Sequence, residues 1–145
     1  MKKYENNTWE NIEGINLSAS RATIKASNNK LYLATTPVFG QNSSQVHVYE
    51  NNNWTKLGED IGGSEVWNLV IDINNETPYV AYSDNKKGSS VVKKLENGKW
   101  IQEGSNVSDE SINKLGFKIR NNKAYVSINP IRSQKLLIKS KQLKK

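Results

Sequence analysis

The chain has 145 residues, which is enough for one domain of ordinary size, and a formal net charge of +7. It has no cysteine and only one histidine, His47, which excludes disulfides, thiolate zinc sites and a multi-histidine metal site within one chain. No apolar run approaches the roughly 20 residues of a membrane-spanning helix. Lys2 and Lys3 are not followed by the apolar segment of a signal peptide. We therefore expect a soluble protein, either cytoplasmic or excised from a longer exported parent, with no cofactor.

Part of the positive charge lies in the C-terminal tail, at Lys135, Lys139, Lys141, Lys144 and Lys145. A basic balance favours acidic partners or simply solubility, and we interpret these lysines as solvated. Nucleic acid is not an expected partner, because the lysines form neither a stripe nor a known binding motif.

One short phrase occurs three times along the chain and reveals an internal repeat. The N-terminus contains it as Tyr4-Glu5-Asn6-Asn7-Thr8-Trp9, and it returns with its tryptophan at Trp54 and again at Trp100. From Trp9 to Trp54 is 45 residues, and from Trp54 to Trp100 is 46. Each unit reads as four short strands, because apolar residues alternate with period two and turn signals recur about every 8–12 residues.

Taken in order, residues 1–14 supply only fragments of the third and fourth strands of a unit. The first complete unit follows, with strands predicted at 21–27, 31–34 and 45–50 and a fourth strand that carries Trp54. The turn between its first two strands is predicted at Asn28-Asn29, because asparagine tolerates the positive φ of tight hairpins.

The second and third units repeat this pattern. In the second, strands are predicted at 66–73, 79–82, 90–95 and 99–103, with the first turn at Asn74-Asn75. In the third, strands are predicted at 112–119, 124–128 and 136–140, with the first turn at Asn121-Asn122. The third unit has no fourth strand.

Four strands in each unit of about 46 residues are typical of β-propeller blades. The motifs Trp54-x-x-x-Gly58, Tyr79-Val80-Ala81-Tyr82 and Tyr49-x-Asn51-x-x-Trp54 resemble repeats of bacterial β-propeller proteins, and the resemblance covers almost the whole chain. We predict an all-β propeller segment of three blades, at 15–58, 59–104 and 105–145, preceded by an outer-strand piece at 1–14.

Three blades are too few to close a ring, since propellers have typically four to eight. Each blade must bury its apolar faces against neighbours. The chain is therefore either a fragment of a longer protein or one half of a six-bladed ring that two copies form head to tail. The surplus strand around Trp9 and the missing fourth strand of the third unit favour the homodimer, in which that strand pairs with 136–140 of the other copy.

Propellers bind ligands at one mouth of the ring, where the connections between blades meet the loops between second and third strands. Aligning the units on their asparagine turns puts Arg21, Trp67 and Lys114 at one equivalent position near this mouth. A tryptophan beside cations can stack on a sugar ring or hold an anion. The alternative is that Trp67 plugs the channel while the two cations point into water. Further residues assigned to the mouth by their loops are Phe39, Asp84, Lys86, Lys87 and Arg132.

Catalysis is not expected. A hydrolase would need paired carboxylates or a nucleophile with its base, but Asp60, Asp84 and Asp109 occupy no equivalent position. We interpret His47, in the middle of a strand, as structural or solvent-facing.

The sequence thus predicts a non-catalytic binding protein whose ligand is a glycan or another polar or anionic surface group, held by Trp67, Arg21, Lys114 and Asp84. The resemblance to lectin-like propellers built from short oligomerising chains is architectural only. The alternative function is a structural or protein-interaction propeller, or part of one, with no small-molecule ligand.

Overall fold

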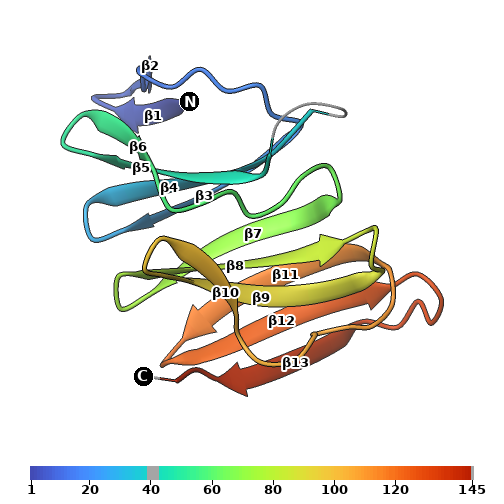
Figure 1. Ribbon diagram of the computed structural model, residues 1–145. Coiled ribbons are helices and arrows are strands. Elements are labelled where there is room, and N and C mark those ends of the chain that lie inside the picture. The colour runs from blue at the N-terminus through green and yellow to red at the C-terminus, as the bar shows by residue number, and fades with distance from the viewer. Residues whose placement is uncertain (39–42, 145) are drawn as a thin grey trace.

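The computed structural model describes residues 1–38 and 43–144, and these form antiparallel strands with no helix (Figure 1). The N-terminal hairpin consists of β1 (Lys2–Glu5) and β2 (Thr8–Asn11). The first sheet contains β3 (Arg21–Ser27), β4 (Lys30–Thr36), β5 (Gln45–Glu50) and β6 (Asn53–Lys56). The second sheet contains β7 (Val66–Asn74), β8 (Thr77–Asp84), β9 (Ser89–Glu96) and β10 (Lys99–Gln102). The third sheet contains β11 (Ile112–Arg120), β12 (Lys123–Pro130) and β13 (Leu137–Gln142).

The all-β prediction is confirmed, and each sheet is a simple meander in which consecutive strands pair. The tight turns form where asparagines can adopt positive φ, as at Asn28 (φ 47°) and Asn121 (φ 50°). One predicted turn was wrong by a residue. In the second sheet Asn74 still belongs to β7, and the turn is formed by Asn75 and Glu76, with φ of 47° and 66°.

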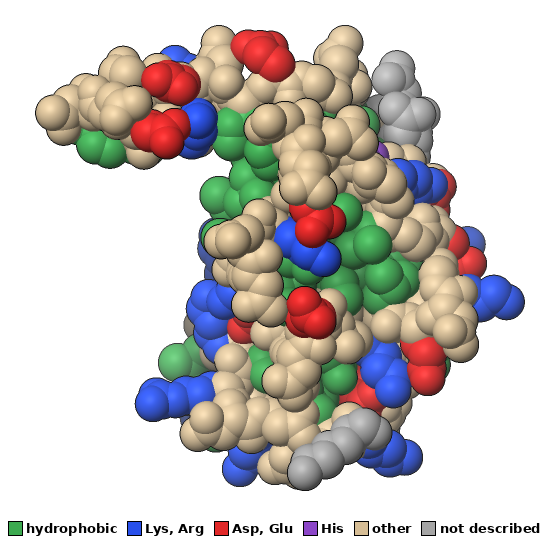
Figure 2. Space-filling model, turned by 90° about the vertical axis from the view of Figure 1, so that its left-hand side faces the viewer, with side chains coloured by type: hydrophobic (Ala, Val, Ile, Leu, Met, Phe, Trp, Pro, Cys, Tyr) green, Lys and Arg blue, Asp and Glu red, His purple; other side chains and the backbone are tan. Residues whose placement is uncertain are grey.

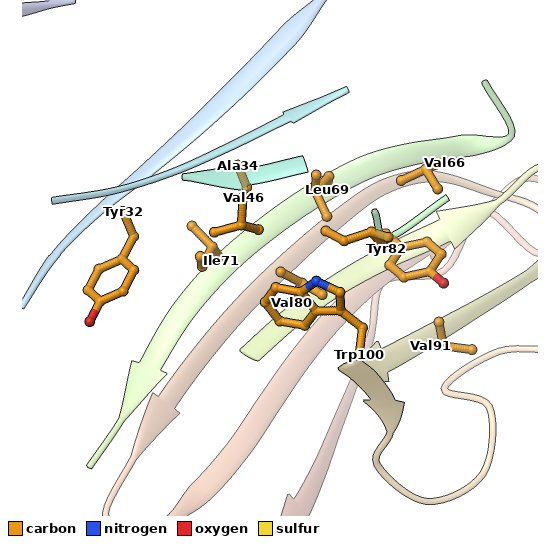
Figure 3. Close-up of a cluster of buried hydrophobic side chains, with 11 residues drawn as sticks. Tyr32, Ala34, Val46, Val66, Leu69, Ile71, Val80, Tyr82, Val91 and Trp100 are labelled. Carbon is orange, nitrogen blue, oxygen red and sulfur yellow. The ribbon is translucent and has the colours of Figure 1, made fainter. Parts of the chain in front are cut away.

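The sheets stack in chain order, and two apolar clusters fill the spaces between them. Tyr32, Ala34 and Val46 of the first sheet pack against the second sheet around Ile71 and Trp100 (Figure 3). The second sheet offers the same positions to the third, with Tyr79, Ala81 and Val92 in the second cluster. The repeat of about 46 residues is therefore a repeat of packing faces. One face of each sheet packs against the following sheet, and the opposite face packs against the preceding one.

The repeated tryptophans hold the connections between sheets. Nε1 of Trp54 donates a hydrogen bond to the carbonyl of Glu13 (3.2 Å), and Nε1 of Trp100 donates to the carbonyl of Glu59 (3.1 Å). In both cases the acceptor lies 41 residues earlier, on the segment that enters the sheet from the preceding unit. Trp100 fills space between the first and second sheets and is 5% exposed. Trp9 lacks such a cover and is 64% exposed.

A buried carboxylate joins the three innermost strands. Asp72 on β7 is 1% exposed, and its Oδ1 lies 2.7 Å from Nζ of Lys25 on β3. Its Oδ2 accepts a hydrogen bond from the backbone N–H of Ile119 on β11, at 2.6 Å. Since a buried charge is tolerated only when it is paired and hydrogen-bonded, Asp72 fixes the first and third sheets relative to the second.

The stack is open at both ends. Ile24 of the first sheet is 57% exposed, whereas its equivalents Ile71 and Phe117 are 2% and 3% exposed. Tyr125 of the third sheet is 40% exposed, whereas Tyr32 and Tyr79 are 4% and 3% exposed. The described sheets therefore do not close into a ring, and the face that each end exposes is a face that the inner sheets bury.

Candidate functional site

One edge of the stack, which we call the loop edge, gathers the connections between sheets (57–65 and 103–111) and the loops between second and third strands (85–88 and 131–136). Backbone bridges tie these connections to the beginnings of the third strands: Ser44, just before β5, pairs with Gly62, and Ser90 on β9 pairs with Ser108. The tight asparagine turns lie along the opposite edge, on the left of Figure 1. The predicted clustering of long connections at one edge is thus present, although the stack does not form a closed mouth.

Strand pairing puts Arg21, Trp67 and Lys114 at equivalent positions on β3, β7 and β11. Each pairs with the residue four places after the repeated tyrosine of the neighbouring strand, namely Thr36, Ser83 and Asn129.

This equivalence survives the shifted turn of the second sheet because β7 contains a bulge. Between the pairs Trp67–Ser83 and Val70–Ala81, two residues of β7, Asn68 and Leu69, lie opposite one residue of β8. Asn68 in the bulge adopts φ 53°, and its side-chain amide donates to Oγ of Ser83 at 3.1 Å. The bulge therefore returns Trp67 to the position that the sequence repeat assigns to it.

Arg21 and Trp67 are in direct contact. Cζ of Arg21 lies 3.8 Å from the centroid of the indole ring, well within the range of a cation–π interaction. Nε1 of Trp67 donates to the carbonyl of Ser64 (3.2 Å), which fixes the ring orientation, and the residue remains 38% exposed. A small hollow of about 150 Å³ opens beside the pair, lined by Ser20, Arg21, Pro37, Ser64, Val66 and Trp67.

Asp84 is committed largely to its own loop. Its Oδ1 accepts hydrogen bonds from the backbone N–H groups of Lys86 (3.0 Å) and Lys87 (2.9 Å). Oδ2 lies 3.9 Å from Nζ of Lys87. The carboxylate thus shapes the β8–β9 loop, and a ligand contact would be left mainly to Oδ2.

The remaining predicted residues are dispersed. Lys114 and Arg132 are exposed on the third sheet and its loop, and Lys87 has an exposed side chain on the second. The structure brings none of them into the hollow beside Trp67. Phe39 lies outside the described residues.

The sequence analysis did not single out Ser20, Ser64 and Glu65. These residues lie on connections between strands, where no periodic pattern predicts the backbone conformation. Oγ of Ser20 donates to the carbonyl of Pro37 at 2.8 Å and so shapes one wall of the hollow. Oε1 of Glu65 accepts from the backbone N–H of Gly63 at 3.0 Å. Backbone hydrogen bonds, its own and that of Gly63, lower the pKa of Glu65, so an ionised carboxylate stands on the same connection as Ser64.

His47 is buried in β5, away from the loop edge, where burial first and the nearby charge of Lys56 second lower its pKa. Since its pKa is lowered, the imidazole is neutral near pH 7. Within residues 1–38 and 43–144, no group of three or more carboxylate and imidazole side chains is placed to hold a metal ion. The same residues contain no helix long and apolar enough to cross a membrane.

No protein-family model matches the sequence, and no curated protein matches it. Among solved structures, the chain is similar to an exo-β-1,3-galactanase from Clostridium thermocellum. The similarity has a TM-score of 0.54 at 10% sequence identity and covers 86% of this chain and 34% of the galactanase chain. The chain thus spans about a third of the length of that enzyme, and at this identity the likeness concerns the fold alone.

Proposed function

We propose that the protein is a non-catalytic binding protein that recognises a glycan, or another polar or anionic surface group, at the loop edge around Trp67. The observation that carries the proposal is the contact between Arg21 and Trp67 beside an open hollow. An exposed indole offers an apolar face on which a sugar ring stacks. A guanidinium held on that indole offers several donors in a fixed orientation for hydroxyls or anionic oxygens.

In this proposal Trp67 supplies the stacking surface and Arg21 the hydrogen-bond donors. Lys114, at the equivalent position of the next sheet, adds a positive charge on the same edge. Asp84 offers Oδ2, because its Oδ1 is already bonded to two backbone amides. The galactanase that shares the fold acts, by its name, on a polysaccharide, which is compatible with a carbohydrate ligand but does not select one.

The architecture that we propose with this function is a β-propeller in which each sheet is one blade. Support comes from the meander of every sheet, from the recurrence of packing positions after about 46 residues and from the open ends. Two copies joined head to tail would form a six-bladed ring, and the loop edges of both would then surround one mouth. The resemblance of the repeat to bacterial propeller proteins fits this arrangement.

A structural or protein-interaction propeller, complete or as part of a longer chain, is the second candidate. The size of the hollow favours it, because about 150 Å³ is less than the roughly 300 Å³ at which small-molecule pockets begin. In that case the pair of Arg21 and Trp67 would be an anchor on a protein surface, a role in which both residue types are frequent.

A glycan array tests the leading proposal, followed by titration of the best glycan against the wild type and Trp67→Ala. We expect the substitution to weaken binding by about tenfold or more, as loss of an aromatic anchor does. Ile101→Ala is the matched control, because Ile101 is 43% exposed on the outer strand β10 and lies outside the hollow. Equal affinities of the wild type and Trp67→Ala would refute the role of Trp67. An array without any bound glycan would leave the protein-interaction function as the better account.

A further inference from the structure

The third sheet borders a cavity of about 220 Å³ beside its edge strand β13, where the second sheet has a fourth strand and the third, in the part of the chain that the structure describes, has none. Its lining comes from three places: Val92 on β9, the connection from Glu103 to Val107, and residues of β12 and β13 with Leu143. An engineered cavity of about 150 Å³ holds a benzene molecule, so this space is of the size that an indole requires. The cavity therefore lies between the second and third sheets and beside the free edge of β13.

The walls of this cavity repeat the surroundings of Trp100. Val46, Ile61 and Val80 belong to the apolar cluster that contains Trp100. Moved forward by 46 residues, these positions become Val92, Val107 and Val126, all of which line the cavity.

The hydrogen-bond acceptor repeats as well. The indole of Trp100 donates to the carbonyl of Glu59, and the residue 46 places after Glu59 is Ser105, which also lines the cavity. The cavity therefore has the surroundings that hold the tryptophan of an outer strand in the second sheet, and among residues 1–38 and 43–144 no such strand pairs with the third sheet.

The N-terminal hairpin carries an outer strand with no sheet of its own. Tyr4 and Trp9 pair across it with ring centroids 5.3 Å apart and planes tilted by 51°. Tyr49 and Trp54 pair across β5 and β6 in nearly the same way, at 5.1 Å and 45°. The strand β2 thus already has the geometry of a fourth strand, while its tryptophan is 64% exposed.

The hairpin stands away from the body of the molecule, as the arm at the upper left of Figure 2 shows. All four residues of β1 are exposed, and no residue of the hairpin belongs to either apolar cluster. A two-stranded ribbon of this kind is marginally stable by itself, so exchanging β1 for another neighbour of β2 costs little.

We propose that Trp9 of a second copy of this chain occupies the cavity beside β13, with β2 of that copy pairing along β13 in place of β1. The third sheet then gains its fourth strand, and the indole of Trp9 donates to the carbonyl of Ser105. The same step brings the first sheet of the second copy onto Tyr125 and Ile138. Ile138 is 71% exposed, whereas Val46 and Val92, which occupy the equivalent position in the first and second sheets, are 0% and 5% exposed. The inference rests on the proposed association of two copies and not on the ligand.

The register of the exchanged strands follows from the repeat. Lys94 pairs with Ile101 in the second sheet, and 46 residues beyond Lys94 is Ser140. Ile101 directly follows Trp100 as Glu10 follows Trp9, so Glu10 of one copy lies opposite Ser140 of the other. Antiparallel partners are close enough for a disulfide, and the 145-residue sequence has no cysteine that would compete.

Oxidation of the double variant Glu10→Cys, Ser140→Cys tests the proposal on the 145-residue chain. We expect disulfide-linked dimers on a non-reducing gel, and few from the control Glu10→Cys, Lys99→Cys, whose second site is exposed on β10. Adding Trp9→Ala to the test pair should lower the rate of linkage by about tenfold or more, as loss of an aromatic anchor does. Trp67→Ala in the same background should leave the rate unchanged.

Three outcomes would overturn parts of this account separately. Equal linkage in the test and control pairs, or none in either, contradicts the register and the exchange. Linkage that Trp9→Ala leaves unaffected contradicts the seating of the indole in the cavity. A ladder of linked chains longer than two supports the seat but contradicts the closed ring. Loss of glycan binding with normal linkage would concern the proposed ligand site alone.

Discussion

At the scale of single residues, the position opposite the repeated tyrosine carries side chains of different charge in the three sheets. Lys25, Asp72 and Lys118 each pair with the tyrosine of the neighbouring strand. Only the central one is acidic, and it is buried between a lysine from one side and a backbone N–H from the other. The sequence contains this alternation of charge, but reading it requires the strand register that the structure supplies.

We expect Asp72→Ala to lower the free energy of unfolding by about 2 kcal/mol, because the backbone N–H of Ile119 loses its acceptor and Lys25, which is partly exposed, loses its charged partner. Asp60→Ala is the matched control. Asp60 is also paired with a lysine, Lys56, at 2.5 Å, but both side chains are exposed, so the loss should stay below about 1 kcal/mol. Urea denaturation of both variants measures the difference. Equal losses would contradict the role of Asp72 as a link between sheets.

At the scale of elements, glycines after the outer strands let each connection pass close to the next hairpin. Gly58 adopts φ 73° and follows β6, and a Cβ there would lie 2.5 Å from Cδ1 of Leu95 and 3.0 Å from the carbonyl oxygen of Gly98. Gly98 has a similar φ of 77°, yet a Cβ there would meet nothing within 4 Å. A substitution at Gly98 therefore tests backbone strain alone, whereas a substitution at Gly58 tests strain together with steric crowding.

Gly98→Ala should cost about 1 kcal/mol, the strain of a left-handed conformation in a residue with a Cβ. Gly58→Ala should cost about 1–3 kcal/mol more, because the added methyl group also overpacks the contact between sheets. Thermal or urea unfolding of the two variants gives the comparison. A loss at Gly58 no larger than that at Gly98 would show that the two sheets separate easily there.

The elements were largely predictable, and the exceptions have a physical cause. Alternation and turn residues located the strands because both are local. The turn of the second sheet lies one residue later than predicted, because Glu76 adopts a positive φ, and the bulge at Asn68 restores the register. A simple sequence period predicts neither the shifted turn nor the bulge. At the candidate site, the repeat placed Arg21 beside Trp67, but the commitment of Asp84 to its own loop depends on loop geometry that no pattern reveals.

At the scale of the whole molecule, the exposed faces at the two ends carry the main consequence. Ile24 at one end and Tyr125 at the other occupy positions that are buried wherever a neighbouring sheet is present. Apolar faces of this kind favour association, and because the two faces differ, contact is head to tail and closes only if the rotation per sheet permits. The cavity beside β13 and the exposed Trp9 belong to the same two ends.

The solution mass of the purified 145-residue chain tests this account most directly. Size-exclusion chromatography with light scattering at micromolar concentration should give twice the chain mass of 16.4 kDa, because each copy covers the open ends of the other. A stable species of 16.4 kDa at that concentration would contradict the account, since both end faces and the cavity beside β13 would then remain uncovered in water.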